Sequence, residues 1–299
     1  MSHPKIARIR VAGPDHKGII AAVTGYLSQN NINIEDIDQR ILEGVLVMNM
    51  VVDFKEMRTP LPHFLKGLRE VARKIRMEIS FHPEKEKKLK EIAILATKEP
   101  HCLEELLRQM KRGEIKGKPV MVLSNRTDLR PIAARYHVPF YYNPSLRKKE
   151  HEEKILKKLA GFDVDGIILA RYMQILSPEF CFRYEGKIIN VHPSLLPSFP
   201  GARAYSQAYH KGVEVTGVTA HFVTTDLDEG PIICQEAFRF DKTKTPLEEI
   251  IERGKKLEAK TLARAVKLFC NNRLVLRRGK VIDNRKLREL TEKTKGFYR

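Results

Sequence analysis

Short apolar runs alternate with helix-like segments from residue 91 onward, and this alternation constrains the fold more than any other feature. Strands that alternate with helices are typical of a parallel, doubly wound sheet, because parallel neighbours need a crossover connection. We predict strands at residues 92–96, 120–123, 138–142, 166–170, 187–191, 216–223 and 232–240, and helices at 102–110, 129–136, 152–159 and 247–269. The expected fold is α/β, with a Rossmann-like, mostly parallel sheet.

The first 83 residues follow a different pattern. They predict strands at 5–12, 32–41, 45–54 and 77–81, and helices at 19–29 and 60–74. The order βαββαβ is that of a ferredoxin-like domain. A charged run then separates the two apolar patterns. We expect one domain over residues 1–83, a linker over 84–90 and a second domain over 91–299.

The composition fits two folded domains. The chain has 299 residues, of which 42% are hydrophobic and 31% charged, and a domain typically takes ~150 residues. No apolar run reaches the ~18 residues of a membrane helix. The N-terminus carries no apolar segment typical of a signal peptide. We therefore expect a cytoplasmic protein.

The net charge of +18 raises the possibility of a nucleic-acid partner. Residues 187–240, however, hold four basic and five acidic side chains, whereas the last 29 residues hold ten basic and three acidic ones. A surface rich in Lys and Glu is also typical of thermophilic proteins, and we do not expect nucleic-acid binding. The four cysteines show no C-x-x-C spacing, so we expect buried, reduced thiols and no metal site.

Two polar clusters follow predicted strands. Asn190 and His192 end one strand on a single face, and His221 and Asp228 lie in the second cluster. In α/β sheets, ligands bind beyond the carboxyl ends of the strands. An amide can stabilise an oxyanion, an imidazole can donate a proton and a carboxylate can accept one. The sequence thus predicts attack on a carbonyl by water or an amine, with Asn190, His192 and Asp228 as catalytic residues.

The same clusters resemble a known family. Asn-x-His-Pro-Ser-Leu-Leu-Pro from Asn190, and His-Phe-Val-x-x-x-Leu-Asp-x-Gly-Pro-Ile-Ile from His221, are similar to the motifs of the folate-dependent formyltransferases. The resemblance implies a 10-formyltetrahydrofolate substrate, no further cofactor, and a catalytic trio of Asn190, His192 and Asp228. It also implies a folate site at Met173, Gln174, Ile175 and Leu176, whose backbone groups hold the pteridine, with support from His221.

The N-terminal domain, with Gly13-Pro14-Asp15-His16-Lys17-Gly18-Ile19, resembles an ACT domain. The resemblance implies a role in oligomerisation and an amino-acid effector, glycine or methionine. The effector site is expected at Asp15, His16, Gly18 and Asn31. An ACT domain ahead of this second domain resembles the deformylase branch of the family, which hydrolyses 10-formyltetrahydrofolate to formate and tetrahydrofolate in one-carbon and purine metabolism.

Two alternatives remain open at this point. The first is an amine formyltransferase with an acceptor such as glycinamide ribonucleotide, because the sequence from His192 to Pro197 is closer to that enzyme. The loop from Thr97 to Cys102, however, has no glycine for a phosphate-binding nest, which favours water. A transfer-RNA acceptor is disfavoured, since about 16 residues after Asp283 cannot form a further domain. The second alternative is a regulatory protein without activity, which the intact catalytic trio disfavours.

Overall fold

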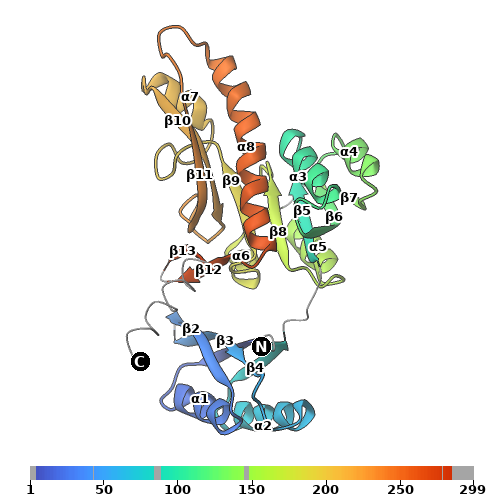
Figure 1. Ribbon diagram of the computed structural model, residues 1–299, viewed down its shortest axis with the longest axis vertical. Coiled ribbons are helices and arrows are strands. Elements are labelled where there is room, and N and C mark those ends of the chain that lie inside the picture. The colour runs from blue at the N-terminus through green and yellow to red at the C-terminus, as the bar shows by residue number, and fades with distance from the viewer. Residues whose placement is uncertain (1–4, 43, 84–88, 145–147, 278, 285–299) are drawn as a thin grey trace, which may run out of the picture. The chain divides into compact units, whose positions relative to one another are not determined.

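The computed structural model describes residues 5–42, 44–83, 89–144, 148–277 and 279–284. The chain divides into two compact units, Met1–Lys87 and Lys88–Arg299 (Figure 1). Most of the expected linker, residues 84–88, lies outside the described residues, as does the basic tail 285–299.

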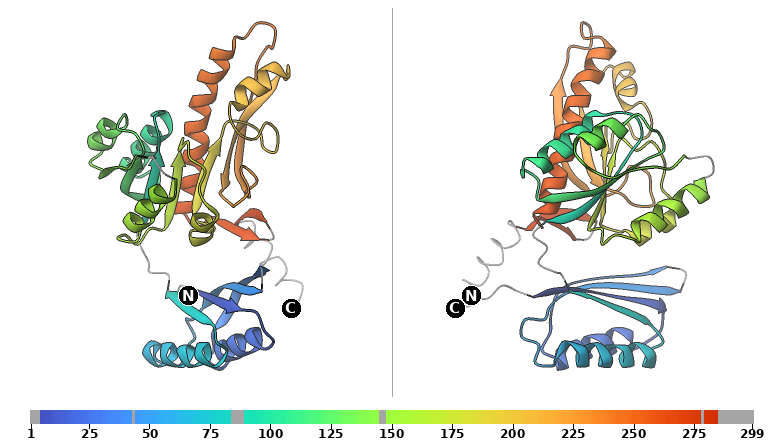
Figure 2. Two further views of the ribbon diagram at one scale, coloured as in Figure 1. Left: turned by 180° about the vertical axis from the view of Figure 1, so that it is seen from behind. Right: turned by 90° about the vertical axis from the view of Figure 1, so that its right-hand side faces the viewer.

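The N-terminal unit has the predicted ferredoxin-like order. Its elements are β1 (Ile6–Pro14), α1 (Ile19–Gln29), β2 (Asn33–Leu42), β3 (Val45–Asp53), α2 (Leu61–Lys74) and β4 (Glu78–Pro83). The four strands form an antiparallel sheet in the order β2-β3-β1-β4, and both helices cover one face of it (Figure 2). Alternate β3 residues such as Met48 and Val52 pack under Val23 and Phe64 of the helices, because successive strand side chains point to opposite faces.

The C-terminal unit contains a seven-stranded sheet in the order β11-β10-β9-β8-β5-β6-β7. Strands β5 to β9 run parallel, and β10 and β11 are antiparallel additions at one edge. The strands are β5 (Lys90–Ala96), β6 (Gly117–Ser124), β7 (Phe140–Tyr142), β8 (Gly166–Ala170), β9 (Ile188–His192), β10 (Val215–Phe222) and β11 (Ile232–Arg239). The helices are α3 (His101–Lys111), α4 (Arg130–Arg135), α5 (Lys148–Leu159), α6 (Pro178–Arg183), α7 (Ala204–His210) and α8 (Leu247–Cys270).

Each face of this sheet has its own hydrophobic core. Ile92 and Ile94 of β5 pack with α3 and α8 on one face, whereas Ala93 and Leu95 pack with α5 and α6 on the other. The central strand is therefore apolar throughout, as expected for a parallel strand that is covered on both sides. This three-layer arrangement confirms the predicted fold class.

Three local elements were absent from the sequence-based prediction: α6, α7 and a hairpin of β12 (Leu274–Arg277) and β13 (Lys280–Asp283). Helices α6 and α7 have six and seven residues, so each offers few positions at which a helical repeat of apolar residues could be recognised, although the six-residue α4 lies within the predicted stretch 129–136. Helix α6 is instead defined by a cap, since the Ser177 side chain accepts a hydrogen bond from the Phe180 N–H.

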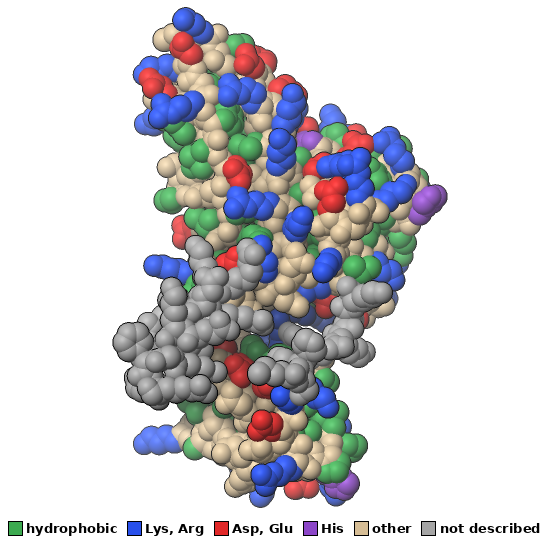
Figure 3. All heavy atoms as spheres, in the orientation of Figure 1, with side chains coloured by type: hydrophobic (Ala, Val, Ile, Leu, Met, Phe, Trp, Pro, Cys, Tyr) green, Lys and Arg blue, Asp and Glu red, His purple; other side chains and the backbone are tan. Residues whose placement is uncertain are grey.

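Within the described part of the chain, no helix combines the length and apolar character that a bilayer crossing requires. On the face drawn in Figure 3, Lys and Arg side chains of the C-terminal unit stand among acidic side chains.

Candidate active site

The register of β9 against β10 places polar residues of the two strands opposite each other. His221 lies opposite Asn190, and Thr219 lies opposite His192. The Asn190 Nδ2 atom is 3.2 Å from the His221 Nε2 atom. The predicted placement of Asn190 and His192 on one strand is confirmed. Antiparallel pairing of β9 with β10 puts His221 beside Asn190.

Asp228 completes this cluster from the loop after β10. Its Oδ2 atom lies 3.2 Å from His192 Nδ1, and its Oδ1 atom lies 3.9 Å from His221 Nε2. The His192 Nε2 atom is 2.9 Å from the carbonyl oxygen of Phe199. Since both ring nitrogens of His192 face acceptor oxygens, either nitrogen can donate its proton to a partner.

The loop holds Asp228 in a strained backbone conformation, with φ of 59°. This left-handed region is more accessible to Asp than to most residues other than glycine. Two residues later, a Cβ atom at Gly230 would lie 1.7 Å from the carbonyl oxygen of Phe222. Only glycine permits this close approach of the loop to β10. Gly201 adds a second constraint, because its N–H donates to Asp228 Oδ2 at 2.8 Å.

The surroundings keep Asp228 ionised. Burial by itself would raise the pKa of Asp228, but hydrogen bonds from His192 and the Gly201 N–H outweigh it, so the pKa lies below its usual value. The Oδ2 atom accepts both of these hydrogen bonds. The Oδ1 atom, which lies beyond hydrogen-bond range of His221, is thus the oxygen that can accept a proton from another molecule.

His221 is neutral at neutral pH. Burial lowers the pKa of His221 more strongly than its contacts with Phe222 and Asp228 raise it. Its Nδ1 atom is 2.8 Å from the carbonyl oxygen of Phe222 and must donate to it. The Nε2 atom is then an acceptor, which the Asn190 Nδ2 group faces. A neutral His221 therefore sets the orientation of the Asn190 amide.

This neutral state predicts a loss of stability in mild acid. Below pH 6.5 an unfolded His221 binds a proton that the buried side chain does not, so lowering the pH favours unfolding until the folded pKa is reached. The contribution is at most about 1.4 kcal/mol per pH unit. We expect His221→Asn to reduce the dependence of the melting temperature on pH between 7 and 5.5, as followed by circular dichroism. The matched control is His210→Asn, at an exposed histidine, which should keep the wild-type dependence of the melting temperature on pH. The same pH dependence in the wild type and in His221→Asn would contradict the assignment of a neutral His221.

The predicted folate segment leaves the carboxyl end of β8. Its Met173 and Ile175 side chains are 58% and 62% exposed, whereas Leu176 is buried. The Met173 N–H donates to Thr97 Oγ1, which follows β5, at 3.0 Å. Gln174 donates from its side chain to the Met173 carbonyl oxygen at 2.9 Å. The loops that follow β5 and β8 therefore contact each other. His221 lies beside Asn190 and not on this segment.

A second buried cluster surrounds Glu258 of α8, and the sequence analysis did not identify it. The carboxylate is 3.0 Å from His101 Nε2, 3.3 Å from Arg171 Nε and 3.0 Å from the Tyr205 hydroxyl, which donates to it. Within the described residues, His101, Cys102 and Glu258 are the group whose spacing could hold a metal ion. Burial raises the pKa of the Cys102 thiol well above its usual value, and a protonated thiol beside a guanidinium is a poor ligand.

The residues expected to bind an effector lie at two separate places. His16 Nε2 is 2.8 Å from the carbonyl oxygen of Ile75, beside the end of β1, where Asp15 also lies. Gly18 caps the start of α1 with φ of 94°, but Asn31 follows the end of this 11-residue helix and donates to Glu56. A helix of this length spans about 16 Å. Within one chain, Asn31 therefore cannot share a small ligand with the other three residues.

Several groups in the site left no clear signal in the sequence. The carbonyl oxygen of Phe199, the N–H of Gly201 and the hydroxyl of Thr97 each contact a candidate residue from another loop. Two of these are backbone groups, which every residue carries. The position of Gly201 directly after Pro200 was the available hint, because it marked a turn near the predicted site.

Comparisons with known proteins assign a family to each of the two units. Residues 90–266 match the formyl transferase family, and residues 5–82 match the ACT domain family. A formyltetrahydrofolate deformylase of Bacillus subtilis is 37% identical over 281 residues, which cover 92% of each chain. One from Haemophilus influenzae is 34% identical and covers 90% of this chain and 95% of its own.

Solved structures give the same relationship. A formyltetrahydrofolate deformylase from Pseudomonas syringae superposes with a TM-score of 0.65 at 29% identity, covering 94% of this chain and 95% of its own. A glycinamide ribonucleotide transformylase from Symbiobacterium toebii has a TM-score of 0.63 at 30% identity, but covers only 66% of this chain. The deformylase structure therefore matches both units of this chain, whereas the transformylase matches only about two thirds of it. The chain belongs to the formyltetrahydrofolate deformylase family, with an ACT domain followed by a formyl transferase domain.

Proposed function

We propose that this chain hydrolyses 10-formyltetrahydrofolate to formate and tetrahydrofolate at the Asn190–His192–Asp228 cluster. The family assignment supports the reaction. The assignment of the site rests mainly on the hydrogen bonds of the Asp228 carboxylate. Its Oδ2 atom accepts hydrogen bonds from His192 and Gly201, whereas its Oδ1 atom can accept a hydrogen bond from a water molecule.

The reaction then proceeds by attack of water on the formyl carbon. Asp228 accepts a proton from the water while the remaining hydroxyl adds to the carbon. The Asn190 amide, held by His221, stabilises the negative charge that develops on the formyl oxygen. His192 then donates a proton to N10 as the carbon–nitrogen bond breaks. Asp228 returns its proton to His192, and tetrahydrofolate leaves with formic acid, which releases its proton to solvent and becomes formate.

The folate is expected to lie along Met173–Leu176, with backbone groups of this segment holding the pteridine. The exposed side chains of Met173 and Ile175 offer apolar surface to a planar ring. Thr97, the first residue of the loop that would have to bind a phosphate-bearing acceptor, instead accepts from Met173, and its carbonyl oxygen accepts from Ser124. Together with the lack of glycine in this loop, these internal contacts favour water as the acceptor.

The test is incubation of the purified protein with 10-formyltetrahydrofolate in the absence of any amine. Formate is assayed enzymatically, and tetrahydrofolate is followed by its absorbance. We expect continuous release of both products in equal amounts. Release that begins only after glycinamide ribonucleotide is added would instead assign the chain as an amine formyltransferase.

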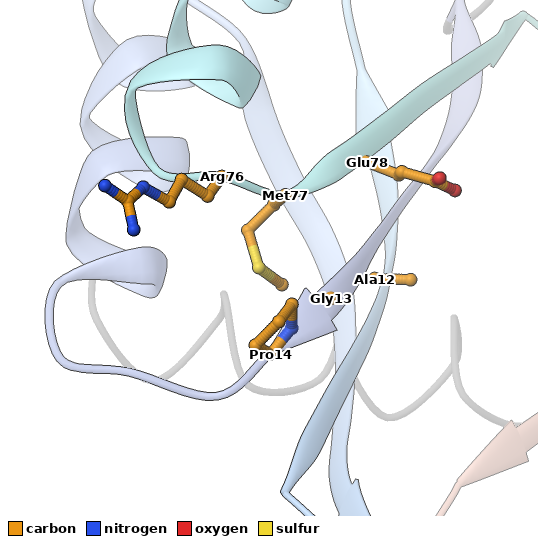
Figure 4. Close-up of a pocket in the computed structure, with 6 residues that line it drawn as sticks. All are labelled: Ala12, Gly13, Pro14, Arg76, Met77 and Glu78. Carbon is orange, nitrogen blue, oxygen red and sulfur yellow. The ribbon is translucent and has the colours of Figure 1, made fainter.

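We further propose that the N-terminal unit binds an amino acid at the end of β1. An open hollow of about 430 Å³ lies there, lined by Ala12, Gly13, Pro14, Arg76, Met77 and Glu78 (Figure 4). Arg76 carries a positive charge that can pair with the carboxylate of a free amino acid, whereas the Glu78 side chain points away from Arg76 (Figure 4). His16 adjoins the hollow through its contact with the Ile75 carbonyl oxygen.

Calorimetric titration of the whole protein with glycine and with methionine tests this site. We expect one of the two to bind, and Arg76→Ala to weaken binding by about tenfold, as loss of one charged hydrogen-bonding partner costs about 1.5 kcal/mol or more. Arg73→Ala, which removes an exposed arginine from α2, should bind as the wild type does. Equal affinity in the wild type and Arg76→Ala would place the effector elsewhere.

A further inference from the structure

The segment that leads from β8 to α6, residues 171–177, contains the predicted folate-binding residues but no helix or strand. A segment that recognises a ligand through its backbone groups needs those groups in defined positions. Without a helix or a sheet to supply this order, the order must come from side chains of other elements. Two consecutive residues of α5, His151 and Glu152, supply it.

Glu152 holds the end of the segment. Its Oε1 atom accepts the backbone N–H of Ser177 at 2.7 Å. The Glu152 side chain is buried, although it lies on a helix whose neighbouring residues Glu153 and Lys154 are exposed. A hydrogen bond to a buried carboxylate is stronger than one between neutral groups. Glu152 therefore fixes the point where the segment passes into α6.

His151 holds the beginning of the segment. Its Nε2 atom is 2.6 Å from the Tyr172 hydroxyl, and the two rings are inclined by only 14°. Burial lowers the pKa of His151 and raises the pKa of Tyr172, so both side chains are neutral at neutral pH. Since His151 Nδ1 faces the carbonyl oxygen of Pro144 at 3.3 Å, Nε2 is the acceptor and the tyrosine hydroxyl is the donor.

The contacts with Glu152 and His151 leave two apolar side chains of the segment 171–177 exposed. Tyr172 is buried, and Met173 is tied through its N–H to Thr97, whereas the side chains of Met173 and Ile175 are among the most exposed apolar groups of the chain. The backbone between Tyr172 and Ser177 is thus held at both ends, with two contacts at its beginning and one at its end. This arrangement presents a pre-ordered surface and reduces the entropy lost when a ligand binds.

We propose that Glu152, assisted by His151, is a positioning residue for folate binding, acting through the backbone of residues 172–177. This inference rests on the proposed function only in taking a reduced folate as the ligand. Glu152 lies outside the catalytic cluster and contacts none of its residues in the described hydrogen bonds. Its removal should therefore weaken folate binding and leave the chemical step nearly unchanged.

The test compares Glu152→Ala with Glu153→Ala, which removes the same side chain from the exposed neighbouring position. We expect Glu152→Ala to raise KM for 10-formyltetrahydrofolate and the Kd for tetrahydrofolate by about tenfold, with kcat within about threefold of wild type. Glu153→Ala should match the wild type in all three. An unchanged Kd, or a fall in kcat with KM unchanged, would overturn the proposal.

Two further variants cover the case in which Glu152→Ala fails to fold. Glu152→Gln keeps an acceptor oxygen for the Ser177 N–H and should restore most of the affinity. Tyr172→Phe removes only the hydroxyl that His151 accepts and should raise the Kd by about threefold. Wild-type affinity in Tyr172→Phe would show that His151 does not assist.

The Kd measurement separates this proposal from the proposed function. If the wild type binds tetrahydrofolate without releasing formate and Glu152→Ala binds it about tenfold more weakly, the positioning role stands and the hydrolytic function fails. If the wild type releases formate and Glu152→Ala has the wild-type Kd and KM, the hydrolytic function stands and the positioning role fails.

Discussion

Replacing Asp228 by asparagine is expected to reduce the rate of formate release from 10-formyltetrahydrofolate by roughly 10³–10⁴-fold, the loss seen when a carboxylate that orients a catalytic histidine is neutralised. The amide can still accept the Gly201 N–H, so the loop should keep its conformation. It cannot take a proton from water, and it cannot stabilise positive charge on His192. The loss should therefore appear in kcat measured at saturating substrate.

Asp226→Asn is the matched control, because Asp226 is an exposed carboxylate in the same loop, two residues away. It should retain wild-type turnover. Both variants should unfold at nearly the same temperature, which circular dichroism would establish. Turnover of Asp228→Asn within tenfold of wild type would show that another group accepts the proton from water.

Replacing Asn190 by alanine has the second largest expected effect, a loss of roughly 10²–10³ in kcat, as is typical for removal of one donor to an oxyanion. The Asn190 amide is oriented by the neutral His221, whose Nε2 atom accepts from Nδ2 at 3.2 Å. The amide acts on charge that develops only in the transition state, so KM should change little. Steady-state kinetics of formate release give both constants.

Asn190→Asp sharpens this test. The aspartate has the shape of asparagine, but its negative charge would face the developing oxyanion and would replace a donor to His221 by an acceptor. We expect it to lose more activity than Asn190→Ala. If Asn190→Asp were the more active of the two, Asn190 would have a structural role rather than a role in stabilising the oxyanion.

The pattern of apolar residues was enough to predict the layers of both domains. In β5, alternate residues serve two different cores, and an uninterrupted apolar run is what such a strand requires. The βαββαβ order of the N-terminal unit followed from spacing in the same way. The short helices α6 and α7 were missed, since six or seven residues offer few positions for a helical period, although the six-residue α4 was predicted.

Only part of the candidate site could be predicted from the sequence. Asn190 and His192 could be placed on one face because a strand repeats every two residues. The pairing of His221 with Asn190 depends on the register between β9 and β10, which are separated by a long connection. The distance between Gly18 and Asn31 within one chain also had to come from the structure, because the two residues lie at opposite ends of α1.

Local periodicity and local spacing were sufficient to predict the fold class, the family motifs and the residue types at the site. The packed structure was needed to show that Asp228 accepts both hydrogen bonds at Oδ2, which way the Asn190 amide points, and that Glu152 holds Ser177 from 25 residues away. Each of these is a hydrogen bond between separate elements, often with a backbone group as one partner. Such contacts depend on how the elements pack, and packing places side chains together that no local pattern connects.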